Sequence, residues 1–137
     1  MAVENHSFGE RLAAAIRRVG HSITVGIDPS LALMPPTFLP DATPLVRVET
    51  FSRTILDAVT DLVAVVKFQS AYFELLGGAG VTLMAQLAAR AKDRGLIVII
   101  DAKRGDIGAT SSAYAEAYLG KDAFIQCDAM TLNPYLG

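Results

Sequence analysis

The sequence predicts an α/β fold that covers about the first four βα units of a (β/α)8 TIM barrel. Two observations support this prediction. Short runs rich in β-branched residues alternate with segments whose apolar residues recur at helical spacing. The runs are apolar on both faces, which is typical of parallel strands covered by helices. Eight βα units need roughly 250 residues, so the 137 residues here are expected to form a single unit, the N-terminal half of such a barrel.

A leading helix is expected over residues 7–20. Ser7 and Glu10 have the spacing of a capping box, in which each side chain bonds a free backbone N–H at the helix start. Gly20 is a typical stop signal. The apolar residues that recur between them are Phe8, Leu12, Ile16 and Val19.

The first strand is expected over residues 22–27. Pro29 has no backbone N–H and would end the hydrogen-bond ladder, which places Asp28 at the carboxyl end of the strand. Several prolines then indicate an ordered surface loop over residues 31–47. Helical spacing of apolar residues returns over residues 49–61.

The rest of the chain repeats this alternation. We expect the second strand over 62–68, a flexible glycine-rich turn over 77–80, a helix over 81–94, the third strand over 96–101, a helix over 109–119 and the fourth strand over 128–133. The glycine-rich turn lacks the Lys-Ser/Thr that follows in a P-loop, so a phosphate-binding role is not favoured.

Composition excludes several classes of function. The formal net charge is −2 and no basic run exceeds Arg17-Arg18, which does not favour nucleic-acid binding. No apolar stretch is longer than that of residues 96–100, which is far shorter than the ~20 residues of a membrane span. Cys127 is the only cysteine, and no secretory leader pattern opens the chain. We therefore expect a cytoplasmic protein, with Cys127 packed in the core at the start of the fourth strand.

Polar residues follow the predicted strands at their carboxyl ends. Asp28, Lys67, Asp101, Lys103 and Asn133 all lie at such ends, and in a (β/α)8 barrel this edge holds the active site. Asp101 and Lys103 are two residues apart on a strand, so their side chains share one face roughly 6–7 Å apart. That spacing lets the ammonium group reach the carboxylate.

These stretches resemble the orotidine 5′-phosphate decarboxylase family, in particular its longer bacterial branch. The matching segments occur in the family's order and are 25–30, 66–74, 101–107 with Thr110, and 131–137. The Asp-x-Lys-x-x-Asp pattern of Asp101, Lys103 and Asp106 is a modest signal alone. The resemblance becomes specific because Asp28 and Lys67 also occur at the ends of the first and second predicted strands, in the family's order.

The resemblance implies a TIM barrel that converts orotidine 5′-monophosphate to UMP and CO2 without a metal or an organic cofactor. Asp28 would bind the ribose hydroxyls, and Lys67 would contact the ribose and Asp101. Asp101 would lie against the departing carboxylate, and Lys103 would protonate C6 of the pyrimidine. A lysine held between carboxylates stays protonated and oriented, which suits a carbanion that develops beside it.

The resemblance also implies a homodimer in which Asp106, Ile107 and Thr110 enter the partner's site. In the family, the residues that hold the substrate phosphate come from the second half of the barrel, which is missing here. Simpler roles stay open for several residues: a strand-end salt bridge for Asp101, Lys103 and Asp106, a snorkelling stem for Lys67, a turn for Asp28 or Asn133, and helix N-caps for Thr110 or Ser111. His6 and His21 lie away from every strand end, so neither is expected to bind a metal.

Two other functions compete with this one. A sugar-phosphate branch that resembles 3-keto-gulonate 6-phosphate decarboxylase shares Asp-x-Lys-x-x-Asp but uses Mg2+ held by a glutamate at the end of the second strand. Lys67 stands at that position here and would repel the cation. Alternatively, the chain is a catalytically incomplete half-barrel whose open edges and apolar interior drive it to associate with the missing half or with itself.

Overall fold

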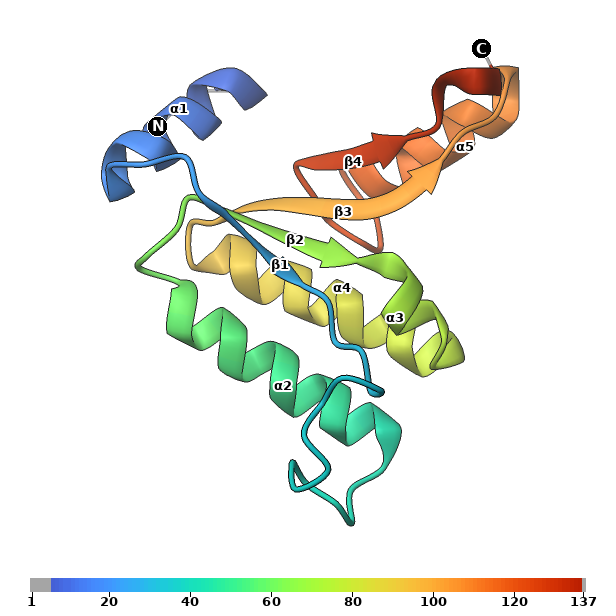
Figure 1. Ribbon diagram of the computed structural model, residues 1–137. Helices are drawn as coiled ribbons and strands as arrows, with labels where there is room; N and C mark the ends of the chain where they lie inside the picture. Colours follow the sequence, from blue (N-terminus) through green and yellow to red (C-terminus); the bar gives the residue numbers. More distant parts are fainter. Residues whose placement is uncertain (1–5, 137) are drawn as a thin grey trace.

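The computed structural model describes residues 6–136 and shows one parallel sheet flanked by helices (Figure 1). The sheet order β1-β2-β3-β4 follows the chain, and each neighbouring pair is parallel. The strands are β1 (Thr24–Ile27), β2 (Val65–Gln69), β3 (Ile97–Arg104) and β4 (Ala129–Leu132). The predicted alternation of four strands with helices is confirmed.

Helices cover one face of the sheet. Figure 1 shows α2 (Pro44–Val59) and α4 (Gly77–Asp93) side by side beneath the sheet, with the short α3 (Ser70–Glu74) after β2. The residues that the strands point at these helices are fully buried and form the main core: Ile27, Val66, Phe68, Val98 and Ile100. Because parallel strands alternate their side chains, the intervening residues must lie on the other face.

That other face is apolar at one end and polar at the other. Val65 and Ile97, near the amino ends of β2 and β3, pack against Ala15 of helix α1 (Phe8–Val19). Two residues further along each strand the pattern continues with Lys67 and Ile99, which are register partners. Figure 1 places α1 only over the amino ends of the strands, so the polar end of this face is left uncovered by it.

The leading helix forms as the sequence predicts. The Ser7 backbone N–H donates to Glu10 Oε2 at 2.7 Å, and the Glu10 backbone N–H donates to Ser7 Oγ at 3.3 Å, which completes the capping box. Gly20 ends the helix with a φ of 85°, in the left-handed region that glycine adopts without strain.

The predicted loop over residues 31–47 is too long at its C-terminal end. Helix α2 begins at Pro44, with Thr43 Oγ1 accepting from the Val46 backbone N–H at 3.4 Å. Proline at the first helical position has the φ of a helix and lacks an N–H that would be unpaired there anyway. Pro44 is therefore a helix start, not a loop residue.

The flexible turn predicted over residues 77–80 is wrong, because α4 begins at Gly77. Gly80 is buried where α3 and α4 meet, and a Cβ built on it would lie 2.0 Å from the Phe73 carbonyl oxygen. Glycine here permits close approach of two helices. The short helix α3 was not expected at all.

Boundaries of all four strands also differ from expectation, and β1 begins at Thr24 instead of residue 22. β2 starts at Val65 because residues before it form a turn in which the Leu62 N–H donates to the Val59 carbonyl. β3 continues past Asp101 to Arg104. Cys127 lies before β4, not at its start, although it is buried as expected, and burial raises the pKa of its thiol to about 11.

The last elements are α5 (Gly108–Leu119), which precedes β4, and the 3-10 turn η1 (Pro134–Leu136). Over residues 6–136, none of the helices has the length and apolar character needed to cross a membrane.

Candidate active site

Lys67 stands at the centre of a polar cluster at the carboxyl edge of the sheet. Its Nζ lies 3.3 Å from Asp28 Oδ1, 3.3 Å from Gln69 Oε1 and 3.2 Å from Asp101 Oδ2. Asp28 directly follows β1, Lys67 and Gln69 belong to β2, and Asp101 belongs to β3. The ammonium group therefore joins the ends of three strands, and it is not a snorkelling side chain with a free head.

Asp101 is shared between two lysines. Oδ2 faces Lys67, while Oδ1 accepts from Lys103 Nζ at 2.5 Å and from Thr131 Oγ1 at 2.8 Å. The hydrogen bond from Lys103, with smaller contributions from Thr131 and Lys67, lowers the pKa of Asp101 to about 2, although partial burial acts in the opposite direction. Asp101 is thus an anion at neutral pH, only 13% exposed.

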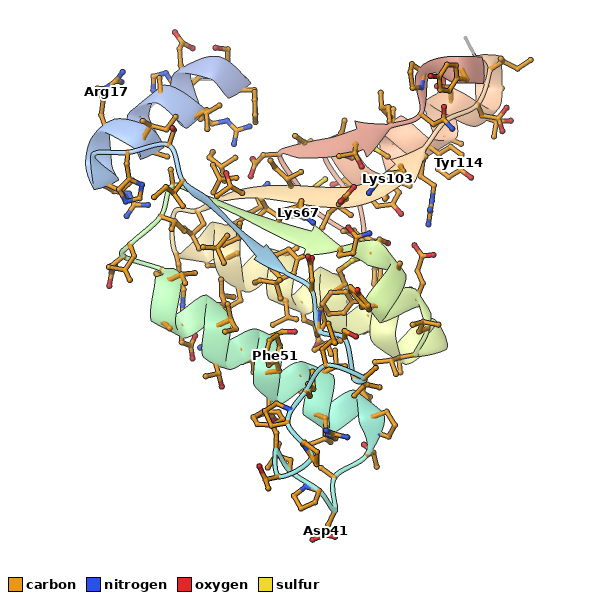
Figure 2. All side chains as sticks on the ribbon, viewed as in Figure 1. Arg17, Asp41, Phe51, Lys67, Lys103 and Tyr114 are labelled. Carbon is orange, nitrogen blue, oxygen red and sulfur yellow. The ribbon has the colours of Figure 1, made fainter. Side chains whose placement is uncertain are left out.

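Lys103 is the most accessible member of the cluster, with 63% of its side chain exposed against 27% for Lys67. Figure 2 shows both lysines on the face of the sheet turned away from α2. The alternation Asp28, Lys67, Asp101, Lys103 places an exposed ammonium group at the end of an ion-paired chain. A group bound over this edge would meet Lys103 and Asp101 together.

The structure does not bring Asp106 to this cluster. Its Oδ1 accepts from the next backbone N–H, that of Ile107, at 2.8 Å, and among residues 6–136 no ion pair to Asp106 is formed. Ile107 is 66% exposed and Thr110 is exposed on α5. Thr110 and Ser111 lie inside α5, which begins at Gly108, so the alternative that they are N-caps is wrong.

Sequence reasoning missed two residues of the cluster, Gln69 and Thr131. Gln69 pairs in register with Asp101, and the same alternation that placed Lys67 on this face could have placed Gln69 there. Asn133 was expected to form a turn, and its Oδ1 does accept from the Tyr135 N–H at 3.1 Å.

A second ion-paired group links the end of β3 to helix α3. The Arg104 guanidinium pairs with Glu74 of α3 and donates to the Ala102 carbonyl oxygen at 2.8 Å. Glu74 also accepts from Ser70 Oγ, which together with the arginine lowers the pKa of Glu74. These contacts hold β3 against α3 at the residue next to Lys103.

A cavity of about 710 Å3 lies elsewhere. It lies beneath α1 at the amino edge of the sheet, between Arg11, Lys92 and Asp128 among others. These two cations are already paired with Asp128. Within residues 6–136, no three His, Cys, Asp or Glu side chains are grouped to hold a metal ion. The charged edge is therefore the stronger candidate site.

The sheet, its helices and the cluster define a class: half of a (β/α)8 barrel whose charged residues stand at the edge where enzymes of this fold hold their active sites. A family model described as "Orotidine 5'-phosphate decarboxylase / HUMPS family" matches residues 8–137. The chain belongs to this family.

Individual relatives agree with this assignment. An orotidine 5′-phosphate decarboxylase of Streptomyces coelicolor is 46% identical over 130 residues, which are 95% of this chain and 46% of the relative. One from Nocardioides is 42% identical over the same shares. The chain spans slightly less than half the length of these relatives.

Solved structures give the same picture. A Streptomyces avermitilis protein solved as a candidate orotidine 5′-phosphate decarboxylase is similar with a TM-score of 0.85 and 42% identity, over 100% of this chain and 48% of that one. The Leishmania donovani OMP decarboxylase is similar with a TM-score of 0.75 and 28% identity, over 96% and 46%. The described fold is thus that of a half barrel in this family.

Proposed function

We propose that this chain supplies the decarboxylation centre of a cytoplasmic orotidine 5′-monophosphate decarboxylase that acts without a cofactor. The observation that carries the proposal is the Asp101 carboxylate held between Lys67 and Lys103, with one oxygen toward each ammonium. Family membership supports the substrate, because the matched relatives carry this enzyme's name.

In the proposed reaction, the bond between C6 and the carboxylate carbon breaks and CO2 leaves. The electron pair stays on C6 and takes a proton from Lys103 Nζ, which yields UMP and a neutral lysine that solvent reprotonates. Lys103 is suited to this step because Asp101 holds its ammonium group in place before the reaction, so little reorganisation is needed. Asp101 is proposed to face the departing carboxylate.

Lys67 and Asp28 are proposed to bind the ribose hydroxyls. Asp28 is half exposed, and its carboxylate has free acceptor capacity beyond the contact with Lys67. The grip on the phosphate is assigned to the other half of the barrel. Binding energy at such a remote group supports the chemistry at the reacting carbon, so we expect residues 1–137 alone to be inactive.

A chimera tests the proposal. It joins residues 1–137 to the part of the Streptomyces coelicolor relative that follows the matched segment. We expect the chimera to consume orotidine 5′-monophosphate, measured by loss of absorbance. Lys103→Ala should lower its activity by about 10²- to 10⁴-fold, whereas Lys121→Ala, at an exposed lysine away from the cluster, should leave it unchanged.

Two results would contradict the proposal: a folded chimera with no activity, or full activity in Lys103→Ala. Treatment with EDTA distinguishes the proposed metal-free reaction from that of the Mg2+-dependent sugar-phosphate branch. We expect no effect of EDTA, because the Lys67 ammonium stands where a metal ligand would be needed.

The dimer is part of the proposal. Asp106, Ile107 and Thr110 are proposed to reach the partner's site, which fits the hydrogen bond of Asp106 to its own loop backbone at Ile107 and the exposure of Ile107. Mixing Lys103→Ala and Asp106→Asn chimeras tests this. Mixed dimers would hold one intact site, so activity should recover to about a quarter of the wild-type value. If both residues served one chain's own site, mixing would restore nothing.

A further inference from the structure

β3 is longer than β4 where the cluster lies. Ile100 pairs with Met130 and Arg104 pairs with Leu132, so three residues of β3, from Asp101 to Lys103, face the single residue Thr131. Such an irregularity interrupts the ladder and redirects side chains. The backbone groups of β3 within it need partners other than the next main-chain group.

The Thr131 side chain supplies that partner. Its Oγ1 accepts from the Lys103 backbone N–H at 3.0 Å and donates to Asp101 Oδ1 at 2.8 Å. One hydroxyl therefore bonds the main chain of one cluster residue and the carboxylate of another. A hydroxyl can donate and accept at the same time, and a methyl group can do neither.

Lys103 has a backbone conformation that needs support. Its φ is 49°, in the left-handed region that non-glycine residues rarely adopt. Such a residue is held in place by its surroundings, and strain of this kind occurs at functional sites. Directly after Lys103, the Arg104 carbonyl accepts from the N–H of Asn133, the residue that follows β4, at 2.8 Å, so β4 and the residue after it hold both sides of the strained position.

We propose that Thr131 is a positioning residue, whose hydroxyl fixes the backbone of Lys103 and the carboxylate of Asp101 relative to each other. The expected effect of Thr131 on kcat rests on the proposed function. The expected effects on the Lys103 backbone and on the Asp101 carboxylate do not. Thr131 acts without contact to the reacting atoms. Its role is to keep the Lys103 ammonium where a proton must be delivered.

The kinetic test uses three variants of the chimera. Thr131→Val keeps the shape and removes the hydroxyl, and it should lower kcat by about 10- to 100-fold because small displacements of a reacting group are costly. KM should change little. Thr131→Ser keeps the hydroxyl and should retain most of kcat. Thr54→Val, at an exposed threonine of α2 whose hydroxyl bonds only its own helix at Thr50, is the matched control.

A second readout does not depend on activity. In the 137-residue chain and in the chimera, 13C NMR follows the titration of Asp101 and hydrogen exchange follows the Lys103 amide. Thr131→Val should raise the pKa of Asp101 and speed exchange of the Lys103 amide, while Thr131→Ser should do neither. If Thr131→Val does not fold, Thr131→Ala takes its place.

The outcomes separate the two proposals. A folded but inactive wild-type chimera would count against the proposed function, and the NMR readout would still decide the role of Thr131. Unchanged Asp101 titration and unchanged Lys103 exchange in Thr131→Val would overturn the positioning role. So would equal kcat in Thr131→Val and wild type, or an equal loss in Thr131→Ser.

Discussion

The Lys103 ammonium nitrogen lies 2.5 Å from Oδ1 of Asp101, two residues earlier on the same strand. Alternation along a strand puts these two side chains on one face, within reach of each other. The other oxygen of the carboxylate faces Lys67. Asp101 is therefore the common partner on which both lysines depend.

Asp101→Asn should change how stability depends on pH. The folded-state pKa of Asp101 is lowered from 3.8 to about 2, so the ionised carboxylate stabilises the fold above its unfolded pKa. The contribution is about 2 kcal/mol and is lost as pH falls from about 4 to about 2. In urea unfolding of the chimera, the difference in the free energy of unfolding between wild type and Asp101→Asn should become smaller as the pH falls from about 4 to about 2.

The control for this measurement is Asp41→Asn. Asp41 is exposed on the loop before α2, far from the cluster in Figure 2. Its variant should follow the wild-type pH dependence throughout. If the difference in the free energy of unfolding between wild type and Asp101→Asn stayed constant from about pH 6 to about pH 2, the lysines would not stabilise the ionised form of Asp101.

The sequence was sufficient to predict Asp28, Lys67, Asp101 and Lys103 at one edge, because position at a strand end and alternation are local properties. Thr131 could not be found in this way. Its place depends on the register between β3 and β4, which the sequence of either strand does not contain. Gly80 was misinterpreted for a related reason: a glycine that permits helix contact and a glycine that permits a turn have the same local pattern.

Asp128→Asn should loosen α1 from the sheet. The Asp128 side chain is 1% exposed, pairs with Arg11 of α1 and Lys92 of α4, and accepts from the Val98 backbone N–H at 2.9 Å. Removing the charge leaves two cations without their buried partner, which should cost about 2–3 kcal/mol. Urea unfolding measures this loss, and hydrogen exchange should show faster opening of α1.

Asp57→Asn is the matched control for Asp128. Asp57 also pairs with two cations, Arg90 and Arg94, but its side chain is 48% exposed. Ion pairs in water contribute little, so this variant should lose less than about 1 kcal/mol. Equal losses in the two variants would mean that burial does not set the strength of the Asp128 contacts.

Gly80→Ala should destabilise the fold more than any other glycine replacement in α4. A Cβ on Gly80 would lie 2.0 Å from the Phe73 carbonyl oxygen and 2.6 Å from Leu76 Cβ, so α3 and α4 would have to separate. Overpacking of this kind should cost about 2–3 kcal/mol. Because α3 begins directly after Gln69, which accepts from Lys67, the shift should also weaken activity of the chimera.

Gly78→Ala is the control on the same helix, since a Cβ there meets nothing within 4 Å. It should instead gain about 0.4–1 kcal/mol, because alanine restricts the unfolded chain. Urea unfolding of both variants decides the question: similar stability would show that the two helices can part without cost.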